Sequence, residues 1–522
     1  MKRRDFLRTS IPAGVMLPSL VSGFSFRAFS ADSNIMRSLL MPVTETDHVF
    51  VIIQLNGGND GLNTVVPIES FSNYVNARQN IYIPEANVLP LNGKAGLHPA
   101  MTGLHAMYQK GYLKVVQSVG YPQPSYSHFR ATDIWMSASD SNTDVNTGWA
   151  GRYLNYEYPN FPNGYPNATM KDPLAIQIGS STSLTLQGPA VNMGMSISST
   201  SNFYNLINGI QDLAPDTPAG KELTYIRTIA QQTQKYASVI KDAALQTVQQ
   251  VSYPTNNSLG DQLKIVARLI KGGLTTRIYM VNYGGFDTHS NQVNSTDSTT
   301  GNHAKLLGNV SDAIKAFQDD LKFLGVDDRV VGMTFSEFGR RIKSNGSTGT
   351  DHGSAAPLFV FGKHVMGGVL GDTPVLPANA TVSDNLPFQY DFRSIYATIL
   401  SNWLCVKDTD LQQIMLKNFQ LLPLVNAGGC QKPINLSGES LVSNYPNPFN
   451  SSTVITFKTD GGHTMVQIMD TSGKVITTLT DREYTAGTYS VVFDSGLLPS
   501  GVYYARLQNM AIQQVRTMLK VK

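Results

Sequence analysis

The fold class is decided by one stretch of the sequence, Val49-Phe-Val-Ile-Ile-Gln-Leu55, which runs directly into Asn56-Gly-Gly-Asn-Asp60-Gly-Leu-Asn63. Its first seven residues are almost entirely apolar and do not alternate with polar ones. An unbroken apolar run of this length, ending at two glycines, indicates a strand buried on both faces of a sheet. The polar loop after it therefore lies at the carboxyl end of a buried strand.

Segments of the same kind recur along the chain, and an amphipathic helix separates two of them. Further buried strands are expected at residues 113–118, 277–282, 329–335 and 358–361. The helix has apolar residues at helical spacing, namely Leu306, Leu307, Val310, Ile314, Phe317, Leu321 and Leu324. A second helical stretch covers about residues 220–251. Strands and helices joined by short links predict right-handed βαβ units, and hence an α/β fold with a mainly parallel sheet and helices on both faces.

Composition limits the classes of function. Charged residues make up only 15% of the chain, and 40 Lys and Arg exceed 37 Asp and Glu by three. No basic face for nucleic acid is therefore expected. Two cysteines, Cys405 and Cys430, are too few for a disulfide framework or a thiolate metal site. They either pair after export or remain two buried thiols.

The N-terminus has the pattern of an export signal. Arg3-Arg4 precede Phe6-Leu7, a weakly apolar stretch follows over residues 11–26, and mostly small residues close it at 28–31. This resembles a twin-arginine signal, which implies a signal peptide over residues 1–31 and the twin-arginine translocase as a partner. An ordinary secretory signal that carries two arginines is the alternative. No other segment reaches membrane-spanning length, so no transmembrane segment is expected in the mature protein.

The composition changes after Leu424. A linker is expected over residues 425–440, followed by six short strands bounded by Gly, Asp, Asn or Pro. The strands are expected at residues 453–458, 464–469, 474–479, 489–493, 502–507 and 515–521. This pattern is typical of an all-β, immunoglobulin-like sandwich, here over residues 441–522.

The same tail carries motifs of a known secretion module. Asn444-Tyr-Pro-Asn-Pro-Phe449, Gly487-Thr-Tyr489 and Leu498-Pro-Ser-Gly-Val-Tyr-Tyr504 resemble the type A C-terminal sorting domain of type IX secretion. The resemblance implies the type IX secretion machinery as a partner. It also implies a protein that is secreted or held at the cell surface after passing the periplasm and outer membrane. A generic adhesive or carbohydrate-binding sandwich is the alternative.

Four polar clusters follow predicted strands in the main unit, at residues 56–63, 124–130, 284–289 and 336–341 with 349–353. In open α/β sheets, ligands bind beyond the carboxyl ends of the strands, so these clusters are candidate sites. Their oxygen and nitrogen donors suit one or two divalent ions of the Zn, Mn, Ca or Mg kind. The candidate metal ligands are Asp60, Asp287, His289, Glu337, Asp351 and His352. Each cluster taken alone is equally an ordinary turn or polar loop.

The second cluster also holds a candidate nucleophile. Ser127 is expected at the N-cap of a helix that begins near His128, where backbone N–H groups face a bound anion. An ordinary helix cap is the alternative for this serine. Arg130 and Arg340 are candidates for gripping the anion through two parallel hydrogen bonds.

Several motifs are similar to the DUF1501 family, over about residues 46–424. They are Gly57-Gly-Asn-Asp-Gly-Leu-Asn-Thr-Val-Val-Pro67, Ser127-His128-Phe129, Gly285-Phe-Asp-Thr-His289, Ser336-Glu-Phe-Gly-Arg340 and Thr350-Asp-His-Gly353. The resemblance implies a fold similar to the alkaline phosphatase and sulfatase superfamily. On that pattern Ser127 falls near the nucleophile, and the matching metal ligands are Asp287, His289, Glu337 and His352. Two positions depart from it: Asn56 stands for the first-strand Asp unless Asp60 replaces it, and Phe338 stands for a ligand His.

The sequence therefore supports two main hypotheses, and a purely structural role in a surface layer is a third alternative. The first is an exported metal-dependent hydrolase of phosphate or sulfate esters, in which Ser127 attacks the ester. The second is a surface protein that kept the fold, lost the chemistry and binds polysaccharide or a protein partner. Sugar-binding clefts are lined by exposed aromatic side chains, so the exposure of nearby aromatic residues separates the two. Those residues are Tyr121, Tyr126, Trp135 and Trp149.

Overall fold

The computed structural model describes residues 46–167, 170–198, 236–247, 249–426, 430 and 442–521, the last range with short gaps at 460–461, 472–473, 486, 497 and 510–512. These residues form two compact units, one within Thr46–Cys430 and one within 442–521. The expected signal peptide at 1–31 and most of the expected linker at 425–440 lie outside the described residues. Within the described ranges, no helix combines the length and apolar character needed to cross a membrane.

A nine-stranded sheet forms the centre of the larger unit, with the order β13-β5-β12-β9-β1-β8-β6-β7 and with β14 beside β5. Its strands are β1 (Val49–Leu55), β5 (Leu113–Gly120), β6 (Ala175–Ile178), β7 (Met195–Ile197), β8 (Ile278–Tyr283), β9 (Val330–Phe335), β12 (Ala356–Gly362), β13 (Gly368–Leu370) and β14 (Tyr390–Asp391). Every pairing is parallel except the two that β12 makes with β5 and β9. The predicted mainly parallel α/β sheet is confirmed.

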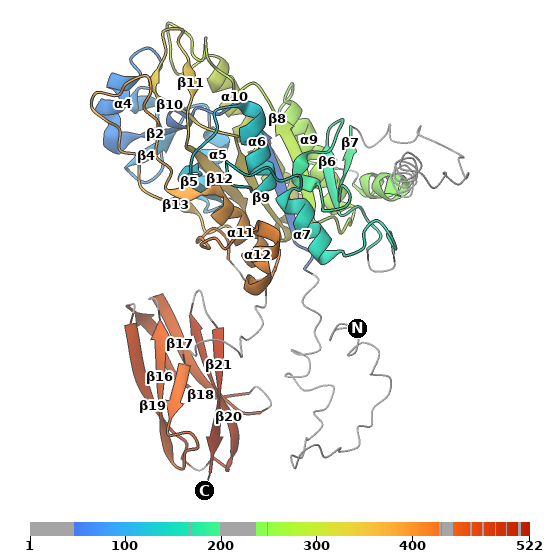
Figure 1. Cartoon of the computed structure of the whole chain (residues 1–522), viewed down its shortest axis with the longest axis vertical. Helices are drawn as coiled ribbons and strands as arrows, with labels where there is room; N and C mark the ends of the chain where they lie inside the picture. Colours follow the sequence, from blue (N-terminus) through green and yellow to red (C-terminus); the bar gives the residue numbers. More distant parts are fainter. Residues whose placement is uncertain are drawn as a thin grey trace. The chain divides into compact units, whose positions relative to one another are not determined.

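Helices cover both faces of this sheet (Figure 1). Phe50 and Ile52 of β1 face a core that also contains residues of α6 (His128–Ser137), α7 (Trp149–Glu157), α11 (Phe392–Asn402) and α12 (Leu411–Met415). The alternate residues of β1 face a second core, which contains residues of α5 (Thr102–Gln109), α9 (Ser258–Lys271) and α10 (Asn302–Phe323). Because both faces are covered, all seven residues of β1 are buried, and this explains its unbroken apolar sequence.

The expected strands of this unit correspond to β1, β5, β8, β9 and β12, and the expected amphipathic helix is α10. Of the second helical stretch, residues 236–246 are helical and residues 220–235 lie outside the described part. The shorter elements are α3 (Gly61–Thr64), β2 (Val65–Pro67), η1 (Ile68–Ser70), α4 (Phe71–Ala77), η2 (Glu85–Asn87), β3 (Leu89–Pro90), β4 (Ala95–Leu97), η3 (Leu184–Leu186), η5 (Asp327–Arg329), β10 (Arg340–Ser344), β11 (Thr350–His352) and η6 (Asp408–Asp410). The hairpin β10–β11 follows β9 in the chain and contributes to the site described below.

The smaller unit is the predicted β-sandwich. One sheet has the order β15-β16-β19 and the other β18-β17-β20-β21, and all their pairings are antiparallel. The strands are β15 (Val442–Tyr445), β16 (Ser452–Thr459), β17 (Gly462–Met469), β18 (Val475–Tyr484), β19 (Gly487–Asp494), β20 (Gly501–Asn509) and β21 (Gln513–Lys520). Alternate residues such as Ile455 and Phe457 of β16 and Val466 and Ile468 of β17 enter one core. This alternation is the reason for the period-two pattern in the sequence.

Cys405 and Cys430 form a disulfide with an S–S distance of 2.02 Å. Of the two alternatives that the sequence leaves open, the structure therefore has the bridge. Cys430 lies at the end of the larger unit, so the bridge fastens that end to the segment that follows α11.

Candidate functional site

Polar side chains from four loops meet at one edge of the large sheet. His128 opens α6 after β5, Asp287 and His289 follow β8, and His352 ends β11. Strands β1, β5, β8 and β9 all point in one direction, so their carboxyl ends share this edge. The structure thus brings together five of the expected ligands, Asp287, His289, Glu337, Asp351 and His352. It adds His128, to which the sequence had given no role in metal binding.

Four donor atoms converge in this cluster. Asp287 Oδ1 lies 3.2 Å from His289 Nε2 and 3.3 Å from His352 Nε2. The two Nε2 atoms lie 2.9 Å apart. His128 Nε2 lies 3.6 Å from the other carboxylate oxygen, Asp287 Oδ2. Nearly half of the Asp287 side chain is exposed, so the cluster opens to solvent.

The opposite nitrogen of each histidine is held by an acceptor behind it. His128 Nδ1 lies 2.8 Å from Glu337 Oε1, and His352 Nδ1 lies 2.8 Å from the carbonyl oxygen of Tyr126. His289 Nδ1 lies 3.3 Å from Asp351 Oδ1. Carboxylate and carbonyl oxygens accept hydrogen bonds, so each Nδ1 carries the proton and donates it. Each Nε2 is thereby directed toward the Asp287 carboxylate, which is the ring orientation that metal-binding histidines have.

These donors fit a divalent metal ion. Ligand atoms of His128, Asp287 and His352 all lie within 4.8 Å of one another, and His289 Nε2 lies 2.9 Å from His352 Nε2 at the side of this group. Nitrogen and oxygen ligands in this ratio suit Zn²⁺ and related divalent ions. The residues that fit such an ion are His128, Asp287, His289 and His352.

Glu337 and Asp351 stand behind the histidines instead of in the cluster itself. Glu337 is buried, and its Oε1 accepts hydrogen bonds from the Gly57 backbone N–H, at 2.8 Å, and from His128. Asp351 accepts from Asn345 and His289. The hydrogen bond from Asn345, which outweighs the opposing effect of partial burial, keeps the pKa of Asp351 below its ordinary value. Both carboxylates therefore hold a histidine ring from behind, whereas the sequence predicted them as metal ligands themselves.

Arg340 has a different role from the one predicted. The sequence predicts that it grips a substrate anion, but its guanidinium is buried and all three of its nitrogens bond to the protein. It donates to the carbonyls of Gly57, Gly58, Phe286 and Thr350 and to Asp287 Oδ1, the last at 2.7 Å. Arg340 thus joins three strand-end loops and leaves no nitrogen for an anion.

The same arginine sets the charge of Asp287. Partial burial raises the pKa of this carboxyl, but the hydrogen bond and the charge of Arg340 outweigh that effect and lower the pKa below its ordinary value. Asp287 is therefore ionised at neutral pH. The backbone of Asp287 also approaches Gly57 closely, since a Cβ on Gly57, whose φ is +123°, would lie 2.3 Å from Asp287 N. Only glycine allows this approach.

Asp60 and Arg130 lie outside the cluster. Asp60 is fully buried, and its Oδ2 accepts from Arg78 and from Gln292, each at 2.6 Å. Burial raises the pKa of Asp60, but the Arg78 cation outweighs it and the pKa is lowered. Arg130 instead binds the loop at residues 140–144, through three carbonyls and the carboxylate of Asp144. Both charges are used within the fold, which corrects the predicted ligand and anion-binding roles.

Ser127 occupies the predicted N-cap position of α6, with extended backbone at φ −87° and ψ 126°. Its side chain makes no capping hydrogen bond, and the residue is exposed. The hydroxyl is therefore not used by the helix. It lies on the residue directly before His128, at the edge of the cluster.

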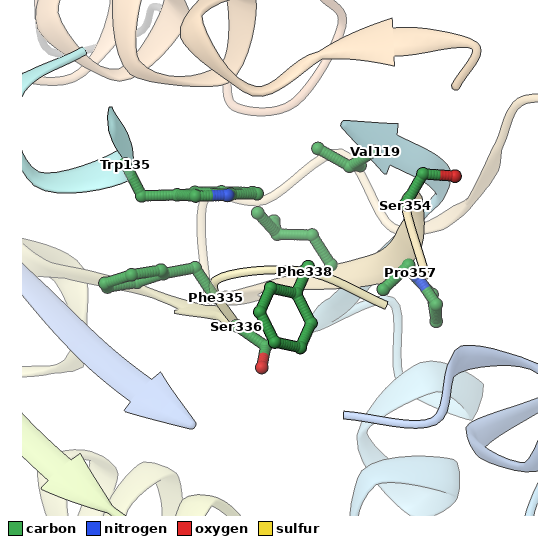
Figure 2. Close-up of a pocket in the computed structure, with 9 residues that line it drawn as sticks. Val119, Trp135, Phe335, Ser336, Phe338, Ser354 and Pro357 are labelled. Atoms are coloured by element: carbon green, nitrogen blue, oxygen red, sulfur yellow. The ribbon is translucent and has the colours of Figure 1, made fainter. Parts of the chain in front are cut away.

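Phe338 forms the wall behind the histidines. Its ring centroid lies 4.9 Å from that of His128 and 4.5 Å from that of His352, and the side chain is buried. Figure 2 shows Phe338 beside a small cavity that is also lined by Trp135 and Phe335. The cavity volume is about 10 Å³, room for one water at most. This cavity is therefore too small for a ligand, whereas the Asp287 side of the cluster is open to solvent.

The aromatic residues near Ser127 divide by exposure. Tyr121, Trp135 and Trp149 are buried in the core, while Tyr126 is 39% exposed. Phe129, which the sequence analysis did not single out for exposure, is 87% exposed. Three of the four residues chosen to separate the two hypotheses thus pack in the core.

His128 is the functional candidate that sequence reasoning missed. The signal was present, because this histidine opens a helix directly after a buried strand, where the chain faces the ligand edge of the sheet. His128 and Glu337 are far apart in the sequence, so the hydrogen bond between them could not be predicted from it. Only the sheet order, with β12 between β5 and β9, brings the two together.

Comparisons with known proteins agree with this division of the chain. The family described as "Protein of unknown function (DUF1501)" matches residues 47–409, and the family described as "Secretion system C-terminal sorting domain" matches residues 443–521. The sorting domain indicates secretion to the cell surface or the outside by the type IX secretion machinery. Curated protein sequences give no match.

Similar solved structures share little sequence with the chain. A sulfatase from Pseudoalteromonas sp. is 10% identical, with a TM-score of 0.31, over 86% of this chain and 83% of that one. A protein in the alkaline phosphatase superfamily from Vibrio parahaemolyticus is 10% identical, with a TM-score of 0.32, over 92% and 84%. An alkaline phosphatase from the Antarctic bacterium TAB5 is 8% identical, with a TM-score of 0.25, over 61% and 92%.

Proposed function

The chain belongs to the DUF1501 family, and from the geometry of its polar cluster we propose that it is an exported metal-dependent hydrolase of phosphate or sulfate esters. The observation that carries the proposal is the convergence of three histidine Nε2 atoms on the Asp287 carboxylate, each ring anchored from behind through Nδ1. Side chains packed only for stability have no need of three such anchored lone pairs at a solvent-facing edge.

A single divalent ion, of the Zn, Mn, Ca or Mg kind, would be held by His128, Asp287, His289 and His352. When bound, the ion would supply Lewis-acid stabilisation of the negative charge that develops during ester cleavage. A second ion has no place behind the histidines, since the Phe338 ring fills that side.

The charges of the cluster favour an anionic substrate. The buried Arg340 cation contacts Asp287 Oδ1 at 2.7 Å and offsets the charge of this carboxylate, which faces the cluster directly. The charge of a bound ion is then not cancelled by Asp287. The carboxylates of Glu337 and Asp351 lie behind imidazole rings, away from the open side. An ester that carries negative charge is therefore attracted to this site.

Ser127 is the proposed nucleophile. Its hydroxyl is free of the capping bond and lies at the start of α6, a helix of ten residues. The backbone N–H groups of the first turn would donate to the non-bridging oxygens of the ester. In the reaction Ser127 Oγ gives up its proton to solvent water and forms a bond to phosphorus or sulfur, while the bond from that atom to the leaving oxygen breaks and this oxygen takes up a proton. Water then cleaves the serine ester, which releases phosphate or sulfate and restores the hydroxyl.

The test is turnover by a Ser127→Ala variant on a panel of phosphate and sulfate esters. We expect turnover to be abolished while bound metal stays at the parent level. A Ser72→Ala variant is the matched control, because Ser72 is exposed on α4 and is not part of the cluster. If the Ser127→Ala variant is as active as the parent, Ser127 is not the nucleophile.

We further propose that residues 1–31 direct export through the twin-arginine translocase. Residues 46–424 would form the catalytic domain, residues 425–440 a linker and residues 441–522 the sorting domain. The Arg3-Arg4 pair supports the export route. Replacing both arginines by lysine is expected to retain the protein in the cytoplasm, and unchanged export would contradict the route.

A further inference from the structure

We propose that the organic part of the substrate is a sugar ring, which stacks on exposed aromatic side chains beside the cluster. This inference rests on the proposed function, because it assigns the substrate class of the same site. In the described part of the larger unit, four aromatic side chains are more than a third exposed, namely Tyr126, Phe129, Phe323 and Phe388. Three of these belong to the two segments that border the cluster, residues 121–130 and 382–389.

The first segment is part of the cluster itself. Phe129 directly follows His128 and is 87% exposed, and the carbonyl of Tyr126 holds Nδ1 of His352 at 2.8 Å. A phenylalanine this exposed keeps most of its apolar surface in water, which disfavours the position unless the surface is used. Phe129 therefore offers a large apolar face within one residue of a proposed metal ligand.

The second segment is fastened to the same loops. Arg341 donates to the carbonyl of His352, at 3.2 Å, and to that of Val382, at 2.6 Å. Farther along, Gln389 N donates to the Ser118 carbonyl at 2.8 Å, beside the carboxyl end of β5. Phe388, which is 39% exposed, therefore lies near the strand that leads into the Ser127 loop.

The form of the site favours a sugar over a purely apolar group. The small cavity that Phe338 lines has a volume of only about 10 Å³, which is too small for a hydrocarbon or an aryl group. On an open surface, a sugar ring can place its C–H face on an aromatic side chain while its hydroxyls stay in water. The class of ligand is therefore a phosphorylated or sulfated sugar.

The experiment measures binding by calorimetry to the full chain carrying Ser127→Ala, with its bound metal, so that no turnover interferes. The probes are glucose 6-phosphate, phenyl phosphate and methyl phosphate. We expect glucose 6-phosphate to bind more tightly than methyl phosphate. Adding Phe129→Ala is expected to lower the affinity for glucose 6-phosphate roughly tenfold and to leave the affinity for methyl phosphate unchanged. Phe323→Ala is the matched control, since Phe323 is 56% exposed at the end of α10, and no change is expected.

The outcomes separate the two proposals. If methyl phosphate binds and glucose 6-phosphate gains nothing over it, or if Phe129→Ala leaves the ratio unchanged, the sugar inference is overturned and the hydrolase proposal stands. If phenyl phosphate binds more tightly than methyl phosphate but glucose 6-phosphate does not, the sugar inference is also overturned, and an aryl group is favoured instead. If neither these three phosphates nor the corresponding sulfates bind, the proposed function itself fails. Because Phe129 is exposed, its replacement does not threaten the fold.

Discussion

The Nε2 atoms of His289 and His352 lie 2.9 Å apart, although each ring donates its Nδ1 proton to a separate acceptor behind it. At this distance the two nitrogens either share one hydrogen bond or face a common cation. Asp287 Oδ1 lies within 3.3 Å of both nitrogens. This arrangement is stable when a cation lies between the rings, and each acceptor behind them then contributes to the strength of that binding.

Glu337 is expected to control metal affinity without being a ligand. Its Oε1 accepts from both Gly57 N and His128 Nδ1, so Glu337→Gln removes the charge that fixes the His128 ring. We expect the metal dissociation constant to rise by roughly 10- to 100-fold, measured by competition with a chelator. Glu85→Gln, at an exposed position, is the control. An unchanged affinity in Glu337→Gln would show that the ring needs no such support.

Arg340 is expected to matter for stability, because it is buried and bonds to three loops. Arg340→Met leaves four carbonyls and the Asp287 carboxylate without their donor. We expect a loss of about 3–5 kcal/mol in the free energy of unfolding, measured by urea denaturation. An Arg340→Met protein as stable as the parent, with only a raised KM, would restore the role in anion binding that the sequence suggested.

The free energy of unfolding is expected to decrease as the pH is lowered, because two histidines are buried. Burial lowers the pKa of His303 to about 4 and that of His98 to about 3, from 6.5. Below pH 6.5 the unfolded chain binds protons that the folded chain excludes, so the folded state loses stability from pH 6.5 down to about 4 for His303 and about 3 for His98. Between pH 6.5 and 5, each histidine lowers the free energy of unfolding by about 2 kcal/mol.

The measurement for this effect is urea unfolding at pH 6.5 and 5. His303→Gln keeps a side-chain amide that can donate to Asn59 Oδ1, as the histidine Nε2 does at 2.9 Å, but does not titrate. The variant is expected to lose about 2 kcal/mol less than the parent over this range. An equal loss in both proteins would mean that other groups carry the pH dependence.

The disulfide is expected to stabilise the end of the larger unit. Cys405 and Cys430 are separated by 25 residues, and closing a loop of that length lowers the entropy of the unfolded chain. Replacing both cysteines by serine is expected to cost about 3 kcal/mol, seen as a lower Tm in the absence of reductant. Adding a reductant to the parent is expected to give a similar shift, and to leave the double variant unchanged. A parent whose Tm does not respond to reductant would contradict this contribution.

The fold was largely predictable from the sequence, because its strands are buried on both faces. Val49–Leu55 and Val330–Phe335 are almost entirely apolar, with Gln54 and Thr334 as their polar residues, and this pattern can be recognised without knowledge of the neighbouring strands. The direction of β12 was not predictable. Its apolar run is the same whether the strand runs with β9 or against it, and the turn through β10 and β11 decides the direction.

The candidate site was predictable in its location and less so in its roles. Asp287, His289 and His352 were found because polar residues at strand ends meet at one edge of a parallel sheet. The role of Asp60 depends on Arg78, 18 residues away, whose cation reaches it only after α4 has folded against β10. Sequence spacing carries no information about which carboxylate a buried arginine will meet.

The most direct test of the metal centre is the divalent metal content of the purified, undialysed full chain. The account predicts one ion per chain, lost in His289→Ala and in His128→Ala. The ion is predicted to remain in the His364→Ala variant. His364 pairs with Asp328 of η5, just before β9, and is not part of the cluster. A parent protein without metal, and without any gain in Tm when Zn, Mn, Ca or Mg is added, would contradict the account.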